Sequence, residues 1–114
     1  MNPTSVKLTA IHLLRWLIAG DYEAIDHFTK GVRLSAVLLR KAIDDYGRTL
    51  VMPPDDALNH INVIDVQRSN PKAWSVRVDL WTAEEGRSDL TLECTFIENG
   101  GDLLTAEIDN LHVL

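Results

Sequence analysis

Four polar residues near the ends of two predicted strands are the side chains best suited to do chemistry in this sequence. His60 and Asn62 precede the apolar end of one strand, and Asn110 and His112 lie near the end of the last strand. If Ile64 and Ile108 face the core, strand alternation turns all four side chains into a concavity beneath the predicted helices. We call this choice of inward-facing residues the parity of the strand. An imidazole there could act as a general base, and the amides could hold an oxyanion. The four residues are therefore pocket candidates.

The opposite parity fits the same pattern equally well. Ile61 and Val63 then face the core in place of Ile64, and the histidines lie at the margin of the sheet. Period-two alternation does not choose between the two arrangements. Because polar residues at a sheet margin are the commoner case, we predict no catalytic residue among them.

The histidines and the single cysteine do not form a metal-binding pattern. A zinc site needs at least three convergent ligands, and His12, His27, His60 and His112 show neither H-x-x-x-H nor H-x-H spacing. Cys94 lies on an alternating strand, which indicates a small core residue in a reducing compartment. The sequence lacks motifs for a serine nucleophile, a phosphate-binding loop or a redox-active cysteine pair. We therefore predict no metal and no cofactor.

The outward face of the last three predicted strands is rich in carboxylates. Its charged residues are Asp79, Asp89, Glu93, Glu107, Asp109 and the cation Arg77. Crowded carboxylates raise the local negative potential, which would suit a bound cation or a basic protein partner. An ordinary solvated face gives the same alternation, and we favour that interpretation.

Trp81 is out of place on this polar face. In the register that we predict, Trp81, Asp89 and Leu111 lie in one row across three strands, and Val113 follows Leu111. An indole in such a position usually has an apolar cover. A second copy of the chain could supply it, which would make these four residues a homodimer interface. The loop at Pro53-Pro54 could also supply it, and we give the two covers equal weight.

Two periods of apolar residues predict the elements that position these side chains. From Val6 to Tyr46 apolar residues recur every three or four positions, which predicts three helices in a layer over residues 5–47. After Gly47 they recur every second position, which predicts an antiparallel sheet of four to five strands over residues 49–114. Its main strands are expected near 58–67, 73–83, 87–98 and 103–113. Helices packed on such a sheet form an α+β domain in two layers.

Local signals refine the helix ends and one turn. Asp21 and Ser35 are predicted to cap the second and third helices. The turn that ends with Gly86 fits a three-residue hairpin loop in which this glycine supplies a positive φ. That loop places Arg77 opposite Glu93 and, by the same register, Trp81 opposite Asp89.

Composition limits the classes of function. The chain has 114 residues, of which 46% are apolar, so it fits one domain with a core of its own. The net charge of −6 and the scattered basic residues argue against nucleic acid as a partner. The N-terminal apolar stretch is interrupted by polar residues, so we expect neither a signal peptide nor a membrane span. We therefore expect a cytoplasmic location.

Four stretches together resemble a group of small uncharacterised bacterial proteins. They are Arg33–Ala36, Asp45–Leu50, Leu80–Leu92 and Ile108–Leu114. The resemblance covers nearly the whole chain and implies a bacterial single-domain protein with no catalytic residue to carry over. At the level of fold, helices followed by a long antiparallel sheet, with the run 19–24 between the first two helices, look like the cystatin-like cone of nuclear transport factor and ketosteroid isomerase. That superfamily contains both enzymes and plain binding modules.

The function that we expect is a non-catalytic module that binds a protein partner or dimerises around Trp81. An immunity-type role would suit a small acidic bacterial protein. The alternative is a small-molecule binder, or an isomerase-like or dehydratase-like enzyme, with a pocket between helices and sheet. An open concavity of about 300 Å³ or more beneath the helices would favour the alternative.

Overall fold

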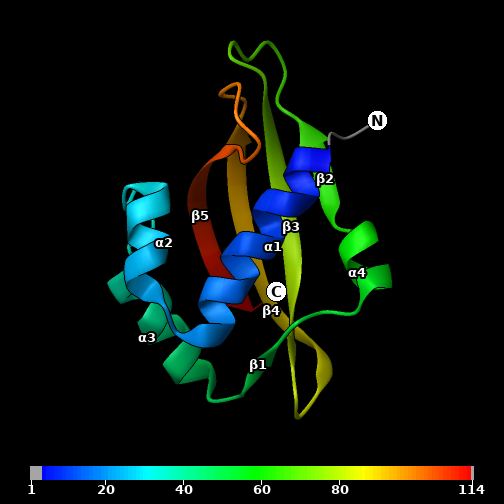
Figure 1. Ribbon diagram of the computed structural model, residues 1–114. Coiled ribbons are helices and arrows are strands. Elements are labelled where there is room, and N and C mark those ends of the chain that lie inside the picture. The colour runs from blue at the N-terminus through cyan, green and yellow to red at the C-terminus, as the bar shows by residue number, and fades with distance from the viewer. Residues whose placement is uncertain (1–3, 114) are drawn as a thin grey trace.

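The computed structural model describes residues 4–113 and has its helices ahead of its sheet in the chain, as the periodicity predicts. Three helices come first: α1 (Thr4–Ala19), α2 (Tyr22–Thr29) and α3 (Ala36–Tyr46). The strands are β1 (Leu50–Val51), β2 (Asn62–Asp65), β3 (Ala73–Thr82), β4 (Gly86–Ile97) and β5 (Thr105–Val113). A short helix, α4 (Asp55–Asn59), lies between β1 and β2 (Figure 1).

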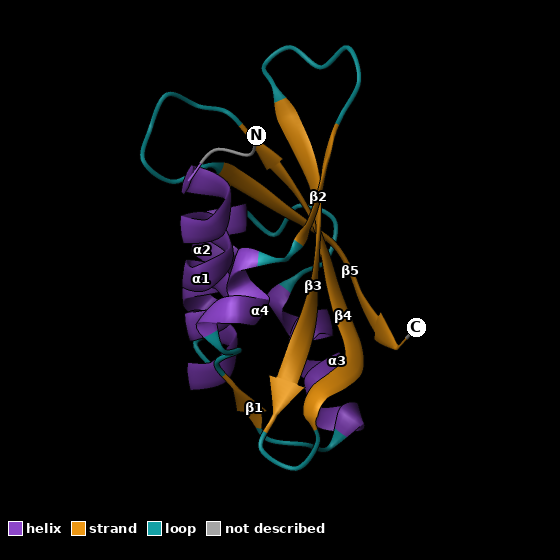
Figure 2. Ribbon diagram, turned by 90° about the vertical axis from the view of Figure 1, so that its right-hand side faces the viewer, coloured by secondary structure: helices purple, strands orange, loops and turns teal. Residues whose placement is uncertain are grey.

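The sheet is antiparallel throughout and has the order β1-β3-β4-β5, with β2 paired to the same edge of β3 as β1. Figure 2 shows α1 and α2 on one side of this sheet. The α+β fold class predicted from the sequence is therefore confirmed. No helix within residues 4–113 is both long enough and apolar enough to cross a membrane.

The core lies between α1 and the inner face of the sheet. Leu13, Leu39, Phe96 and Ile108 are completely buried, and the alternating apolar residues of β3 and β4 pack against them. Four alternating positions on each of these two strands are at most 3% exposed: Trp74, Val76, Val78, Leu80, Leu90, Leu92, Cys94 and Phe96. Hydrophobic burial on this scale supplies most of the driving force for folding.

Capping of the helices differs in one place from the prediction. The Asp21 carboxylate accepts a hydrogen bond from the Ala24 N–H at 3.1 Å, as expected for the start of α2. At the start of α3, the Ser35 hydroxyl makes no capping bond, and the Ala36 N–H instead donates to Asp26 of α2 at 2.9 Å. One aspartate therefore fixes α3 against α2.

Part of the predicted first strand is helical. The segment predicted as a strand over 58–67 contains the end of α4 and only four strand residues, because Pro53-Pro54 leads directly into a helical turn. Leu58 of α4 is buried in the core. In α3, the helical period of apolar residues would place both Leu38 and Leu39 on the buried side, but Leu38 is 49% exposed and only Leu39 is fully buried.

Two bulges change the register that the sequence predicted. Arg77 lies opposite Glu93, as expected, but the pairing shifts between Asp79 and Trp81, so that Trp81 lies opposite Arg87 and not Asp89. A second shift, in β5 at Asp109 and Asn110, follows the pair Cys94–Ile108. Bulges insert residues into one strand only, so a strict alternation cannot reveal them.

Candidate functional site

A cleft of about 650 Å³ opens at the edge of β3, between β1 and β2. In Figure 1, α4 lies to the right of β3 at this level, above β1 and below β2. The cleft is lined on one side by α4 and the segment that follows it, and on the other by outward side chains of β3 and β4. Its lining includes Pro53, His60, Asn62, Arg77, Trp81 and Arg87.

The cleft exists because neither neighbouring strand reaches the middle of β3. β2 pairs with β3 as far as Arg77, and β1 begins to pair at Trp81. The residue that would continue β1 opposite Asp79 is Pro53, which has no N–H to offer a ladder. The chain turns away there into α4, and residues 78–80 of β3 lack a strand partner on this side.

Backbone groups of Asp79 face this gap. Ala73 accepts from Val66 and Ala83 donates to Thr49, so the odd-numbered residues of β3 direct their N–H and C=O groups toward the β1 and β2 edge. By this alternation, Asp79 presents a donor and an acceptor to the cleft. Such an exposed pair on a sheet edge is ready to bond another extended backbone.

Side chains at one end of the cleft combine an aromatic ring with a cation. Trp81 is partly buried and lies opposite Arg87 on the outward face of the sheet. The position of a Cβ on Gly86 would be 3.8 Å from the Trp81 ring, so the hairpin backbone supports the indole. Arg87 forms no ion pair with any other described residue, whereas Arg77 contacts Glu93 at 3.0 Å.

The hairpin that carries Trp81 is fixed by two glutamates. The backbone N–H and hydroxyl of Thr49 donate to Glu84 at 2.9 and 3.0 Å. Tyr46 and Thr82 donate to Glu85, each at 2.9 Å. The hydrogen bond from the Thr49 backbone is the main reason that the pKa of Glu84 is lowered.

His60 has one ring nitrogen engaged by its own helix. Its Nδ1 is 2.7 Å from the Asp56 carbonyl oxygen, which can only accept, so Nδ1 donates and Nε2 is left to accept from a ligand. Asn62, two residues further on, is exposed and also lines the cleft. These two predicted pocket residues therefore do meet at a hollow, although on the rim of the sheet and not beneath the helices.

The other two predicted pocket residues lie elsewhere. Asn110 is exposed, and His112 lies 3.2 Å from Glu93 through its Nε2. The parity that would turn all four inward is wrong: Ile64 is 61% exposed, and the bulge in β5 reverses the parity after Ile108. Ile61 and Val63 pack against the core in the alternative parity that the sequence also allowed.

The predicted row of interface residues is likewise broken by the bulges. Leu111 lies opposite Leu92 and is only 6% exposed, so it belongs to the core. Val113 is exposed beside the buried Leu90. Asp89 lies in the bulged segment and has no opposite residue on β3. Trp81 alone keeps the outward position that we predicted, with Pro53 among the residues that line the same cleft.

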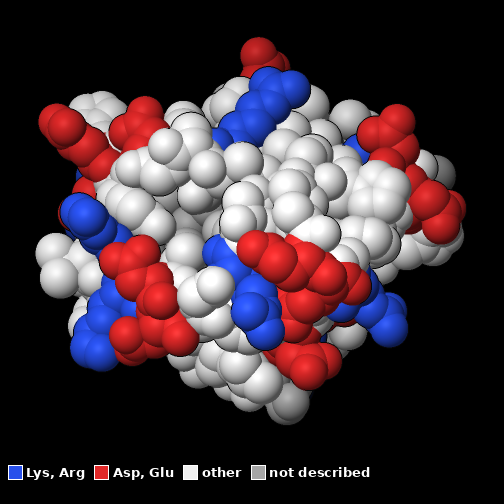
Figure 3. Space-filling model, turned by 90° about the horizontal axis from the view of Figure 1, so that it is seen from below, with Lys and Arg blue, Asp and Glu red and all other residues white. Residues whose placement is uncertain are grey.

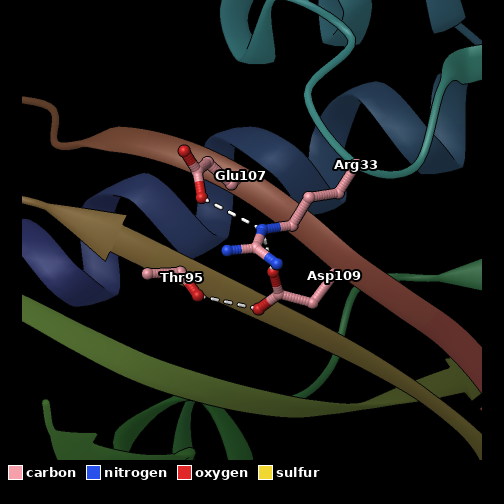
Figure 4. Close-up of polar contacts among 4 residues, drawn as sticks. All are labelled: Arg33, Thr95, Glu107 and Asp109. Carbon is pink, nitrogen blue, oxygen red and sulfur yellow. Dashed lines mark hydrogen bonds and ion pairs between the residues drawn. The ribbon is translucent and has the colours of Figure 1, made fainter.

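Arg33 pairs with two carboxylates of the acidic face, and no local sequence pattern marks this contact. Figure 4 shows its guanidinium between Glu107 and Asp109, with Nε 3.1 and 2.9 Å from their carboxylate oxygens. Thr95 donates to the other oxygen of Asp109 at 2.8 Å. The Leu34 N–H donates to the Ile108 carbonyl at 3.0 Å, which holds this segment against β5. Arg77 pairs with Glu93 on the same face, whereas Asp79 and Asp89 form no ion pair with a described residue.

Charges of both signs are mixed on other faces as well. Figure 3, which views the molecule from below, shows acidic and basic side chains side by side with no extended field of one sign. In the part of the chain that the structure covers, no three histidine, cysteine or acidic side chains converge to hold a metal ion. Burial raises the pKa of the Cys94 thiol far above its usual range, so this side chain is inert.

Comparisons with known proteins identify the family but no activity. A search of curated proteins found no match, and a search of solved structures found none either, so the likeness to the cystatin-like cone stays a prediction, as does a bacterial origin. A family model described as "Domain of unknown function (DUF7668)" matches residues 14–114, which is most of the chain. The chain therefore belongs to this family of unknown function.

Proposed function

We propose that the chain is a non-catalytic binding module that recognises an extended segment of a protein partner in the cleft beside Trp81. The observation that carries this proposal is the open stretch of β3 edge at Asp79, where a backbone donor and acceptor face a cleft of about 650 Å³. A peptide that pairs with Asp79 adds a short strand between β1 and β2.

The side chains around the gap favour a peptide of particular composition. Trp81 offers a flat apolar surface on which methylene groups can pack. Arg87, which has no carboxylate partner among residues 4–113, lies beside it and would bind an acidic side chain. Facing residues of paired strands project to the same face, so the peptide residue opposite Asp79 points toward the face of Trp81 and Arg87, and a glutamate there fits both side chains.

Packing beneath the helices weighs against the alternative of a pocket between helices and sheet. That space is occupied by buried side chains such as Leu13, Leu17 and Phe96, each at most 2% exposed. The large cleft lies at the sheet edge, outside this layer. A free buried cysteine also fits the reducing, cytoplasmic location expected from the sequence.

The test uses capped tripeptides and the NMR signals of the protein itself. One pool carries glutamate as the middle residue, which lies opposite Asp79, and a matched pool carries lysine in its place. We expect the glutamate pool to shift the Asp79 backbone amide and the Trp81 indole N–H, and Trp81→Ala and Arg87→Gln each to weaken this response several-fold.

Two controls separate recognition from nonspecific contact. Trp16 and Trp74 provide indole signals away from the cleft, and these should not move. Equal responses to the lysine and glutamate pools would contradict the role of Arg87. Absence of any shift at Asp79 with every pool would reject the proposed site.

A further inference from the structure

The outer edge of β2 is open and unusually apolar. In residues 4–113, β2 pairs only with β3, so its other edge carries no strand. Ile64 is 61% exposed and Val66 is 40% exposed, and both project to the same side of this edge strand. Native edge strands are usually protected by lysine, proline or a covering element, and the run 61–67 contains neither residue.

Backbone groups on this edge are also unpaired among the residues that the structure describes. Val66 donates to Ala73 at 3.0 Å, so the even-numbered residues of the segment face β3. Alternation then turns the N–H and C=O groups of Val63 and Asp65 away from the sheet. They present two donors and two acceptors in the spacing that another antiparallel strand requires.

We infer that β2 pairs with β2 of a second copy, so that the two sheets join across a twofold axis. An isologous antiparallel pairing brings each segment opposite itself in reverse. Centred on Ile64, it bonds Val63 of each copy to Asp65 of the other and places the two Ile64 side chains in direct contact. Centred on Asp65, the pairing would oppose two carboxylates, which is unfavourable.

Charge complementarity supports the register centred on Ile64. Counted along this register, Arg68 of one copy falls level with His60 of the other, and both residues lie in turns just beyond the paired strands, Arg68 with a φ of +59°. His60 is 3.7 Å from the carboxylate of Asp56, which is the nearest acidic group on α4. Arg68 has no ion pair with any residue that the structure describes, so the dimer would supply its partner twice, once on each side of the axis.

Because the contact involves one short strand from each copy, it is a small interface of the weak or transient class.

Sedimentation velocity on the full chain tests the inference. The concentrations extend to about 1 mM, because a small interface associates weakly. We expect a monomer–dimer equilibrium for the wild type. Ile64→Lys should raise the dimer dissociation constant by about tenfold or more, because it places two lysines at the axis. Val37→Lys is the matched control, since Val37 is an exposed valine on α3 and should leave the equilibrium unchanged.

A backbone variant and a charge exchange address the register. Asp65→Pro removes an N–H that points away from β3, so it should abolish the dimer while the monomer stays folded by circular dichroism. Arg68→Glu and Asp56→Lys should each weaken self-association. Mixed together, they should form a heterodimer, because both ion pairs are restored between unlike copies.

Three results would overturn the inference. They are a wild type that stays monomeric throughout the concentration range, an Asp65→Pro variant that is folded and still dimeric, and a mixture of the charge variants that associates no better than either variant alone.

Discussion

At the scale of single residues, Gly86 sets the hairpin that presents Trp81. Its φ of +75° lies in the region that residues with a Cβ resist, whereas a Cβ at this position would meet the Trp81 ring only at ordinary contact distance. The expected cost of a substitution is therefore conformational. Gly86→Val should lower the free energy of unfolding by about 1 kcal/mol or more, because β-branched residues resist positive φ most strongly.

Denaturant unfolding measures this effect, and Gly86→Asn is its matched control. Asparagine adopts positive φ more readily than valine, so it should lose clearly less stability. Equal losses for the two variants would mean that the space beside Trp81, and not the backbone conformation, determines the preference for glycine.

Glu84 gives the stability a dependence on pH. The hydrogen bonds from Thr49 lower the pKa of its carboxyl group in the folded chain, so the folded state binds its proton less readily than the unfolded state. Its stabilisation is present above the ordinary glutamate pKa and is lost as the pH falls through the lowered value. The stability gap between wild type and Glu84→Gln should therefore narrow on acidification from neutral pH.

The measurement compares denaturant midpoints of the two proteins at neutral pH and at a pH below the ordinary glutamate range. Glu98→Gln serves as a control, because Glu98 is exposed and has no side-chain hydrogen bond or ion pair with a described residue. If the difference in denaturant midpoint between wild type and Glu84→Gln stays constant with pH, the Thr49 contact favours the charged carboxylate no more than the neutral amide.

At the scale of elements, the sequence predicts most of what is built from local periods. The three long helices, the long strands and their buried faces follow from apolar spacing and are confirmed. Helix α4 was missed because five residues are too short to show a period of 3.6. The same stretch had been assigned to a strand, which moved the start of β2 by four residues.

Contacts between elements were predictable only in part, because they depend on bulges and on residues far apart in the chain. The register of the β3–β4 hairpin was right at Arg77 and Glu93, which lie farther from the turn, and wrong at Trp81 beside the turn, because the bulge lies between these two pairs. Leu111 was placed on the outer face because nothing in an alternating pattern marks the bulge in β5. Arg33 was missed because its partner Glu107 lies 74 residues away in the chain.

At the scale of the whole molecule, the two proposed surfaces lie at separate places along one edge of the sheet. Ile64 is opposite Ser75, and Trp81 is six residues further along β3, which corresponds to roughly 20 Å at the rise of a strand. Sites at this distance without shared partners usually behave independently. α4 and the segment after it lie between Ile64 and Trp81 and also line the cleft, so the substitutions that separate the two functions are placed at Ile64 and Trp81 themselves.

We therefore expect the two functions to be separable by single substitutions. Ile64→Lys should abolish the dimer and leave the Asp79 amide shift caused by the glutamate tripeptides unchanged. Trp81→Ala should weaken that shift and leave the dimer dissociation constant unchanged. The readouts are NMR titration and sedimentation, made on the same preparations. Loss of both properties in either folded variant would show that peptide binding and self-association share one surface, most directly through Arg68 of the partner copy at His60, which lines the cleft.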